Sequence, residues 1–253
     1  MPQPTIRETV LPDPDCGPYG IAAGPDGALW VTLVRSGGIA RVSADGAVRV
    51  HHPGDPASRP LVVTAGPDGA LWYAGMSNDT VGRVDVDGTH TAYPLPVVGG
   101  FPSMITAGPD EALWFTLHQA NAVGRIAPDG EVTLHPLPTA AGPVGITLGV
   151  DGALWFVEIA AGQLGRITTD GRIEEFPLPD RAARPHAIVA DPAGGCWFTE
   201  WAANRIGHVT AGGHVDGYDL PTPGSEPHGL AVLPDGTVHA ALESGAIAHL
   251  TPA

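Results

Sequence analysis

The sequence predicts an all-β fold, a six-bladed β-propeller made of four-stranded antiparallel blades. The first observation is a recurring tryptophan: Trp30, Trp72, Trp114, Trp155 and Trp197 are spaced 42, 42, 41 and 42 residues apart. The second is that one more step of 42 residues reaches His239 in a similar context. The third is that each interval contains short apolar runs separated by turn residues. Repeats of this length and content are typical of propeller blades.

Each unit is predicted to contain four strands in a fixed order. In the unit at 142–179, four runs rich in Ile, Val, Leu, Phe and Trp alternate with Asp-Gly turns or a Gly/Ala loop, which indicates antiparallel strands. The first run, 144–148, mixes small and β-branched residues, as expected for a strand crowded near the axis. The second carries the tryptophan, whose ring we expect between neighbouring blades. No segment has apolar residues at helical spacing over a useful length.

The two ends of the chain are predicted to meet in one blade. The last unit begins near 226 and stops after three strands, whereas residues 5–12 are similar to the fourth strand of another unit at 172–179. We therefore predict that residues 1–12 form the outer strand of the last blade and close the ring, which leaves no unpaired central edge. The whole chain, 1–253, then forms one domain with six repeats from 17 to 253. A closed ring predicts a monomer.

Composition argues against several classes of partner. The formal charge is −15 with only 12 Lys plus Arg, so no basic surface is expected for nucleic acid or for an anionic membrane. No apolar run approaches the ~18 residues that span a bilayer. The N-terminus has neither the basic start nor the apolar core of a signal peptide. Cys16 and Cys196 are expected to be free thiols, and the protein is predicted to be cytoplasmic.

Candidate functional residues gather where the first strand of a unit starts and the second ends, because these points lie on the same face of the disc. Strand pairing across the last Asp-Gly turn places His228 opposite Leu242, next to Glu243. Glu226 precedes the same strand as His228. The neighbouring unit has His186 at the position equivalent to His228, so two carboxylates and two imidazoles are expected around one opening near the axis.

These residue types suit metal-assisted acid–base chemistry. Glu226 and Glu243 are hard oxygen ligands of the kind that Mg²⁺ prefers. His228 is suited to act as a general base, because imidazole exchanges protons near neutral pH. Tyr19 lies at the equivalent position of the first unit, and only two units have histidine there, so the repeat itself does not require histidine. The alternative is that these histidines bind a water molecule in the central channel.

Other polar residues are interpreted as structural. Glu158 and Glu200 end second strands and are interpreted first as polar caps of their loops and second as pocket wall. His118 is grouped with the scattered surface or packing histidines. The acidic residues of the tight turns lie on the opposite face: Asp26, Asp68, Asp110, Asp151 and Asp235. The arginines that recur with the unit are Arg83, Arg125, Arg166 and Arg205. No motif of serine hydrolases, nucleotide-binding loops or zinc sites occurs.

Several segments resemble the virginiamycin B lyase (streptogramin B lyase) family over nearly the whole chain, among them GPYGI (17–21), FPSMIT (101–106), RPHAI (184–188), WFTEWAANRIG (197–207) and EPHGL (226–230). The resemblance implies a Mg²⁺-dependent lyase that linearises a small cyclic depsipeptide antibiotic by eliminating across its ester without adding water. It implies His228 as proton acceptor, Glu226 and Glu243 as metal ligands, and His186 and Tyr19 as substrate contacts. Family members are similar to seven-bladed rings, whereas this sequence has six units.

Two other functions stay open at this point. A lactone hydrolase would use the same site but add water to the ester. A non-catalytic propeller of the NHL-like kind would bind a ligand or a protein, and it is equally compatible with the fold because fold does not fix function.

Overall fold

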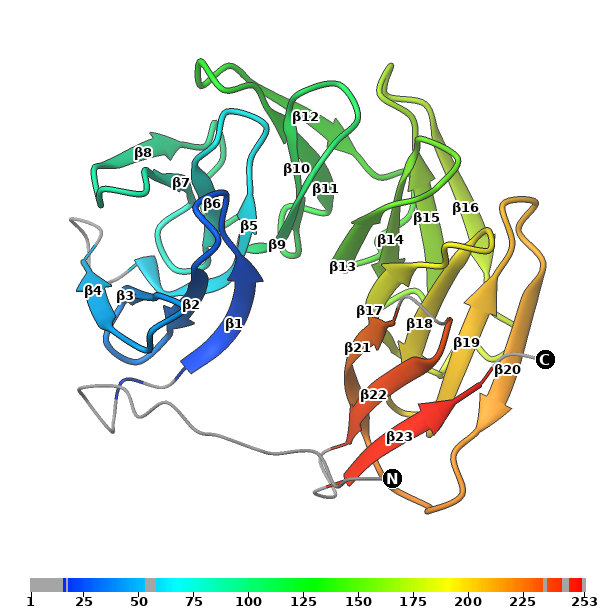
Figure 1. Ribbon diagram of the computed structural model, residues 1–253. Helices are drawn as coiled ribbons and strands as arrows, with labels where there is room; N and C mark the ends of the chain where they lie inside the picture. Colours follow the sequence, from blue (N-terminus) through cyan, green and yellow to red (C-terminus); the bar gives the residue numbers. More distant parts are fainter. Residues whose placement is uncertain (1–15, 17, 53–57, 234–235, 243–245, 252–253) are drawn as a thin grey trace.

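The structure is a computed structural model that describes residues 16, 18–52, 58–233, 236–242 and 246–251. The regular elements in these ranges are all β-strands, arranged as six antiparallel sheets about a common centre (Figure 1). The predicted six-bladed propeller is confirmed. The described part of the chain has no helix that is long and apolar enough to cross a membrane.

Strands with the same place in the repeat have closely similar lengths. The innermost strands are β1 (Pro18–Ala23), β5 (Pro60–Ala65), β9 (Pro102–Ala107), β13 (Pro143–Leu148), β17 (Pro185–Ala190) and β21 (Pro227–Val232). The second strands are β2 (Leu29–Leu33), β6 (Leu71–Gly75), β10 (Leu113–Leu117), β14 (Leu154–Glu158), β18 (Cys196–Glu200) and β22 (Val238–Leu242). The third strands are β3 (Gly38–Val42), β7 (Thr80–Val84), β11 (Ala122–Ile126), β15 (Gln163–Ile167), β19 (Arg205–Val209) and β23 (Ala246–Leu250). The outermost strands are β4 (Val48–His51), β8 (His90–Pro94), β12 (Val132–Pro136), β16 (Ile173–Pro177) and β20 (Val215–Asp219).

Five blades have four strands, and the sixth has three within the described residues. The prediction that residues 1–12 supply its outer strand and close the ring concerns residues outside the described ranges, so it stays a prediction. Successive innermost strands contact one another from β1 through β21, and Figure 1 shows the first and sixth blades at the two ends of this series.

The repeated tryptophans fill the space between blades, as predicted. Trp114 is fully buried and clusters with Ile146, Leu154 and Phe156 of the following blade. The equivalent residue of the first blade is far more exposed within the described part of the chain: Leu29 is 46% exposed whereas Leu154 is 0% exposed. Packing between consecutive blades is therefore the main source of burial in this fold.

Among the described residues, the tryptophans of the first four blades are also hydrogen-bonded to their own turns, whereas Trp197 of the fifth blade is not. In the third blade the Trp114 Nε1–H donates to Asp110 Oδ1 at 3.0 Å, and Arg125 Nε donates to Asp110 Oδ2 at 2.6 Å. The first, second and fourth blades repeat this set of contacts. The structural interpretation of these four aspartates and of Arg83, Arg125 and Arg166 is confirmed. The prediction that Arg205 shares this repeat position is wrong, because His208 lies opposite Trp197 and Arg205 bonds Glu200 instead. In the first four blades the turn is fixed by a carboxylate that accepts a hydrogen bond from the buried tryptophan ring.

The innermost strands lie very close together at the axis. A Cβ atom at Gly145 on β13 would lie 2.7 Å from the carbonyl oxygen of His186 on β17, the innermost strand of the next blade, so only glycine allows this approach. Every innermost strand also has a β-bulge directly after its first residue, a proline. There the pairing with the second strand of the blade shifts register. In the sixth blade Pro227 pairs with Leu242, and the next paired residue is Leu230.

This bulge corrects one prediction. His228 was expected opposite Leu242, but the partner of Leu242 is Pro227. The prediction assumed regular pairing, but a bulge removes residues of one strand from the ladder of backbone hydrogen bonds and changes the direction of their side chains. The predicted free thiols are confirmed: Cys16 and Cys196 are buried and unpaired, and burial raises the pKa of the Cys196 thiol.

Candidate active site

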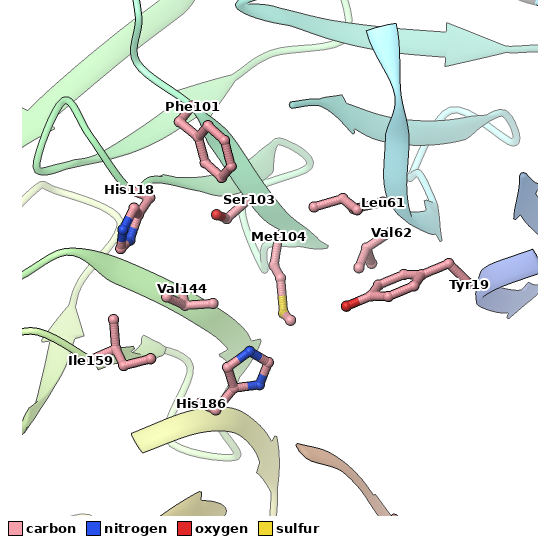
Figure 2. A pocket seen from close by; sticks show the side chains of 10 residues that line it. All are labelled: Tyr19, Leu61, Val62, Phe101, Ser103, Met104, His118, Val144, Ile159 and His186. Carbon is pink, nitrogen blue, oxygen red and sulfur yellow. The ribbon is translucent and has the colours of Figure 1, made fainter. Parts of the chain in front are cut away.

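One position of the repeat supplies half of the residues that line a central cavity. The second residues of the six innermost strands are Tyr19, Leu61, Ser103, Val144, His186 and His228. All of these except His228 line a cavity of about 220 Å³. Figure 2 shows the side chains of Tyr19 and His186 approaching this cavity from different blades. The structure therefore brings these two predicted substrate contacts to one place.

The walls of the cavity are largely apolar. They are formed by Leu61, Val62, Phe101, Met104, Val144 and Ile159. Polar groups come from Tyr19, Ser103, His118 and His186. A mostly apolar surface with a few convergent polar groups is typical of small-molecule sites. A wider groove shares His118 and Ile159 with the cavity and is also lined by Arg181 and Arg184.

Sequence reasoning missed several of these wall residues. His118 was expected among surface or packing histidines, but it lines the cavity and its ring lies edge-on to Phe101 at 5.9 Å. Leu61, Ser103 and Val144 share the repeat position of the two site histidines, and that shared position is a signal that could have identified them. His118 and Phe101 lie just outside the strands. At such positions the alternation of side chains along a strand does not predict which way a side chain points.

The two predicted histidines lie side by side. His186 on β17 and His228 on β21 have ring centroids 4.7 Å apart at an interplanar angle of 82°. The ring of Trp201 lies 6.4 Å from that of His228, and the Arg184 guanidinium carbon lies 5.8 Å from the Trp201 ring. Adjacent blades thus bring two imidazoles together, of which His186 lines the cavity and His228 lies beside His186.

Glu226 has, directly before this site, a backbone conformation that recurs at the same place in other blades, at Arg59, Phe101 and Arg184. Its φ is 51°, in the left-handed region that is costly for residues other than glycine. Such strain persists only where the surroundings fix it. Here the preceding residue is buried, and its Ser225 N–H donates to Asn204 Oδ1 at 2.7 Å. The position of Glu226 beside Pro227 and His228 is therefore fixed by its neighbours.

A Mg²⁺ site is compatible with what is described. Glu226 has a hard carboxylate and directly precedes the strand that carries His228, and Mg²⁺ commonly binds through one or two carboxylates while keeping several waters. Glu243, the second predicted ligand, lies outside the described residues. Among the residues that are described, no group of three or more His, Cys, Asp and Glu side chains is arranged to hold a metal.

Glu158 and Glu200 are both buried, at the ends of β14 and β18. Glu200 Oε2 accepts a hydrogen bond from Arg205 Nε at 2.6 Å, and burial raises the pKa of this carboxyl. Glu158 Oε2 accepts from Gln163 Nε2 at 2.5 Å, and burial raises the pKa of Glu158 to about 7. Neither lines the central cavity. Their bonds to the next strand support the interpretation as caps.

Comparison with known proteins gives a consistent result. The virginiamycin B lyase family matches residues 3–250. The crystal structure of virginiamycin B lyase from Staphylococcus aureus is 42% identical and superposes with a TM-score of 0.93, over 96% of this chain and 83% of that chain. A catalytically inactive variant of the S. aureus enzyme with quinupristin superposes with a TM-score of 0.92 over the same shares.

Curated relatives match over short segments. Virginiamycin B lyase of Saccharopolyspora erythraea is 63% identical over 46 residues, which is 18% of this chain and 15% of that protein. The enzyme of Mycobacterium sp. strain KMS is 78% identical over 32 residues, 13% of this chain and 11% of that protein. The aligned segments thus span less than a fifth of these relatives.

Proposed function

The chain belongs to the virginiamycin B lyase family, and we propose that it is a Mg²⁺-dependent carbon–oxygen lyase that opens the lactone ring of a streptogramin B-type cyclic depsipeptide. The observation that carries this proposal is the histidine pair, His186 and His228, with rings 4.7 Å apart beside a largely apolar cavity. The superposition on the S. aureus enzyme at a TM-score of 0.93 supports it.

The cavity and the adjoining groove divide the binding of such a substrate between them. A volume of about 220 Å³ is enough for one or two side chains rather than a whole macrocycle. We assign the cavity to an apolar side chain of the depsipeptide, with Tyr19 and His186 as polar contacts. The groove lined by Arg181 and Arg184 then faces the remainder of the ring, where the guanidinium groups are suited to bind its carbonyl oxygens.

The reaction needs one group that removes a proton from a specific carbon of the substrate. His228 takes the proton from the carbon next to the one that carries the ester oxygen. The electron pair of that C–H bond forms a carbon–carbon double bond, the carbon–oxygen bond breaks, and the carboxylate half of the ester leaves. No water is consumed, so the mass is unchanged. Mg²⁺ held by Glu226 and Glu243 would supply Lewis acidity at a neighbouring carbonyl, which acidifies this C–H.

Mass spectrometry tests the reaction class directly. Incubation of the purified protein with quinupristin and Mg²⁺ should give a linear product of unchanged mass with a new double bond, and His228→Ala should give none. A product heavier by one water would show a lactone hydrolase instead. Binding of quinupristin without any product would show a non-catalytic propeller.

Thermal melting tests the metal separately. Mg²⁺ should raise the melting temperature of the wild type, because a ligand that binds only the folded state stabilises it. Glu226→Ala should lose this increase. Glu131→Ala is the matched control, since Glu131 is an exposed glutamate beside a turn on the opposite face. An equal Mg²⁺ effect in wild type and Glu226→Ala would exclude Glu226 as a ligand.

A further inference from the structure

A single buried hydroxyl connects the two strands that carry the site histidines. Thr199 lies on β18 and is fully buried. Its Oγ1 accepts a hydrogen bond from the backbone N–H of Ala187 at 3.0 Å and donates one to the backbone carbonyl oxygen of His228 at 3.0 Å. Ala187 directly follows His186, so the hydroxyl bridges the backbone beside one histidine to the backbone of the other.

The bulge in β17 explains why this hydroxyl is needed there. Regular pairing between β17 and β18 is interrupted between Pro185 and Ile188. The backbone N–H of Ala187, a buried residue, therefore takes no part in the regular backbone pairing with β18. A buried N–H without a partner is costly, and Thr199 Oγ1 provides the partner. The bond therefore stabilises the same bulge that sets the direction of the His186 side chain.

Other blades show that the fold does not require a hydroxyl at this position. The equivalent residues of the second and fourth blades are Ala74 and Val157, and both are fully buried. Thr116 in the third blade makes the same kind of bridge, from the Met104 N–H to the Val144 carbonyl oxygen. A blade can thus form with or without the bridge. The bridge at Thr199 differs from the one at Thr116 in that it joins two imidazole-bearing strands.

We propose that Thr199 is a positioning residue for the reaction, which sets the placement of His228 relative to His186; this inference rests on the proposed lyase function. Thr199 is fully buried and does not line the cavity, so it acts through the backbone of the two histidines rather than on substrate. Proton transfer depends steeply on geometry, and a misplacement of about 1 Å can lower a rate by roughly a hundredfold. Loss of the bridge should therefore lower turnover more than binding.

Three variants separate positioning from general stability. Thr199→Val keeps the shape of the side chain and removes the hydroxyl, and we expect kcat to fall by about tenfold or more with a smaller change in KM. Thr199→Ser keeps the hydroxyl and should restore most of kcat. Thr116→Val is the matched control, because it removes the equivalent bridge between strands that carry no titratable site residue. It should lower the melting temperature by a similar amount and leave kcat near that of the wild type, with any effect falling on KM, because Met104 and Val144 line the cavity.

NMR of the histidine side chains gives a readout that does not depend on turnover. The imidazole resonances of His186 and His228 can be assigned from His186→Ala and His228→Ala, and they should shift in Thr199→Val but not in Thr116→Val. Unchanged resonances and kcat in Thr199→Val, or equal changes in Thr116→Val, would overturn the inference. A wild type without lyase activity would refute the proposed function instead, and the resonances alone would then decide whether Thr199 positions the pair.

Discussion

Replacement of Glu158 by glutamine should stabilise the protein at neutral and alkaline pH, which is an unusual effect for a change at a fully buried site. Glu158 has one oxygen bonded to Gln163, and its Oε1 has no hydrogen-bond partner among the described residues. Burial raises the pKa of this carboxyl from 4.5 to about 7. The folded protein therefore holds a proton over a pH range in which the unfolded chain has already lost it.

The size and sign of the effect follow from this difference in pKa. Below about pH 4.5 both states are protonated and Glu158 has no effect on the free energy of unfolding. Between about pH 4.5 and 7 the unfolded state ionises first, so stability falls as the pH rises. At ~1.36 kcal/mol per pKa unit, the loss is about 3 kcal/mol above pH 7. For a chain of 253 residues this corresponds to about 6 °C in melting temperature.

Glutamine has the shape of glutamic acid and does not ionise, and its carbonyl oxygen can still accept the bond from Gln163. Denaturant unfolding of wild type and Glu158→Gln should be measured from pH 4 to 8. The difference between them should grow by about 3 kcal/mol over this range. Glu200→Gln is the contrasting variant: it removes the anionic partner of Arg205 and should destabilise the protein, whereas the pH dependence at this position has the same sign because burial raises the pKa of Glu200 as well. Curves for Glu158→Gln and wild type that stay parallel from pH 4 to 8 would refute the reasoning.

Three further outcomes are expected. His228→Ala should lower kcat for quinupristin about 10²- to 10⁴-fold with an unchanged circular dichroism spectrum; full activity in this variant would assign the base elsewhere. Trp155→Ala should lower the free energy of unfolding by about 3–5 kcal/mol in guanidinium titrations, because the ring is fully buried between blades, and a loss below 1 kcal/mol would contradict its packing role. Gly165→Ala should cost about 1–3 kcal/mol in the same titration, since its Cβ would lie 2.1 Å from the Phe156 ring; an unchanged midpoint would show that the ring moves freely.

The fold could be predicted because each blade is encoded by nearby residues. In the third blade the turn aspartate, the tryptophan and the arginine that bind one another are separated by only 4 and 15 positions in the sequence. The pattern therefore repeats with the unit and is visible without any knowledge of long-range contacts. The predicted packing of the tryptophan against the next blade followed from its size and its fixed place in the second strand.

The site could be predicted only in part. Equivalent residues of the innermost strands face the same centre, so Tyr19 and His186 were correctly expected at one opening and His228 was correctly expected beside His186. The register of His228 was wrong by one residue, because counting from the turn assumes regular pairing and the strand has a bulge between Pro227 and Leu230. His118 lies in the cavity wall because of the path of the loop that follows its strand. The repeat pattern does not predict the path of a loop.

The pair of imidazoles and the hydroxyl that bridges them belong to the fifth and sixth blades alone, whereas the apolar walls of the cavity come from the second, third and fourth. Contacts in this architecture run between neighbouring blades, so a substitution at Leu61 or Phe101 would reshape the cavity wall without contacting the histidine pair. Under the proposed lyase function, the residues assigned to proton transfer and those assigned to substrate preference thus lie on separate segments of the chain, so relatives could differ in the compounds they bind while sharing one reaction.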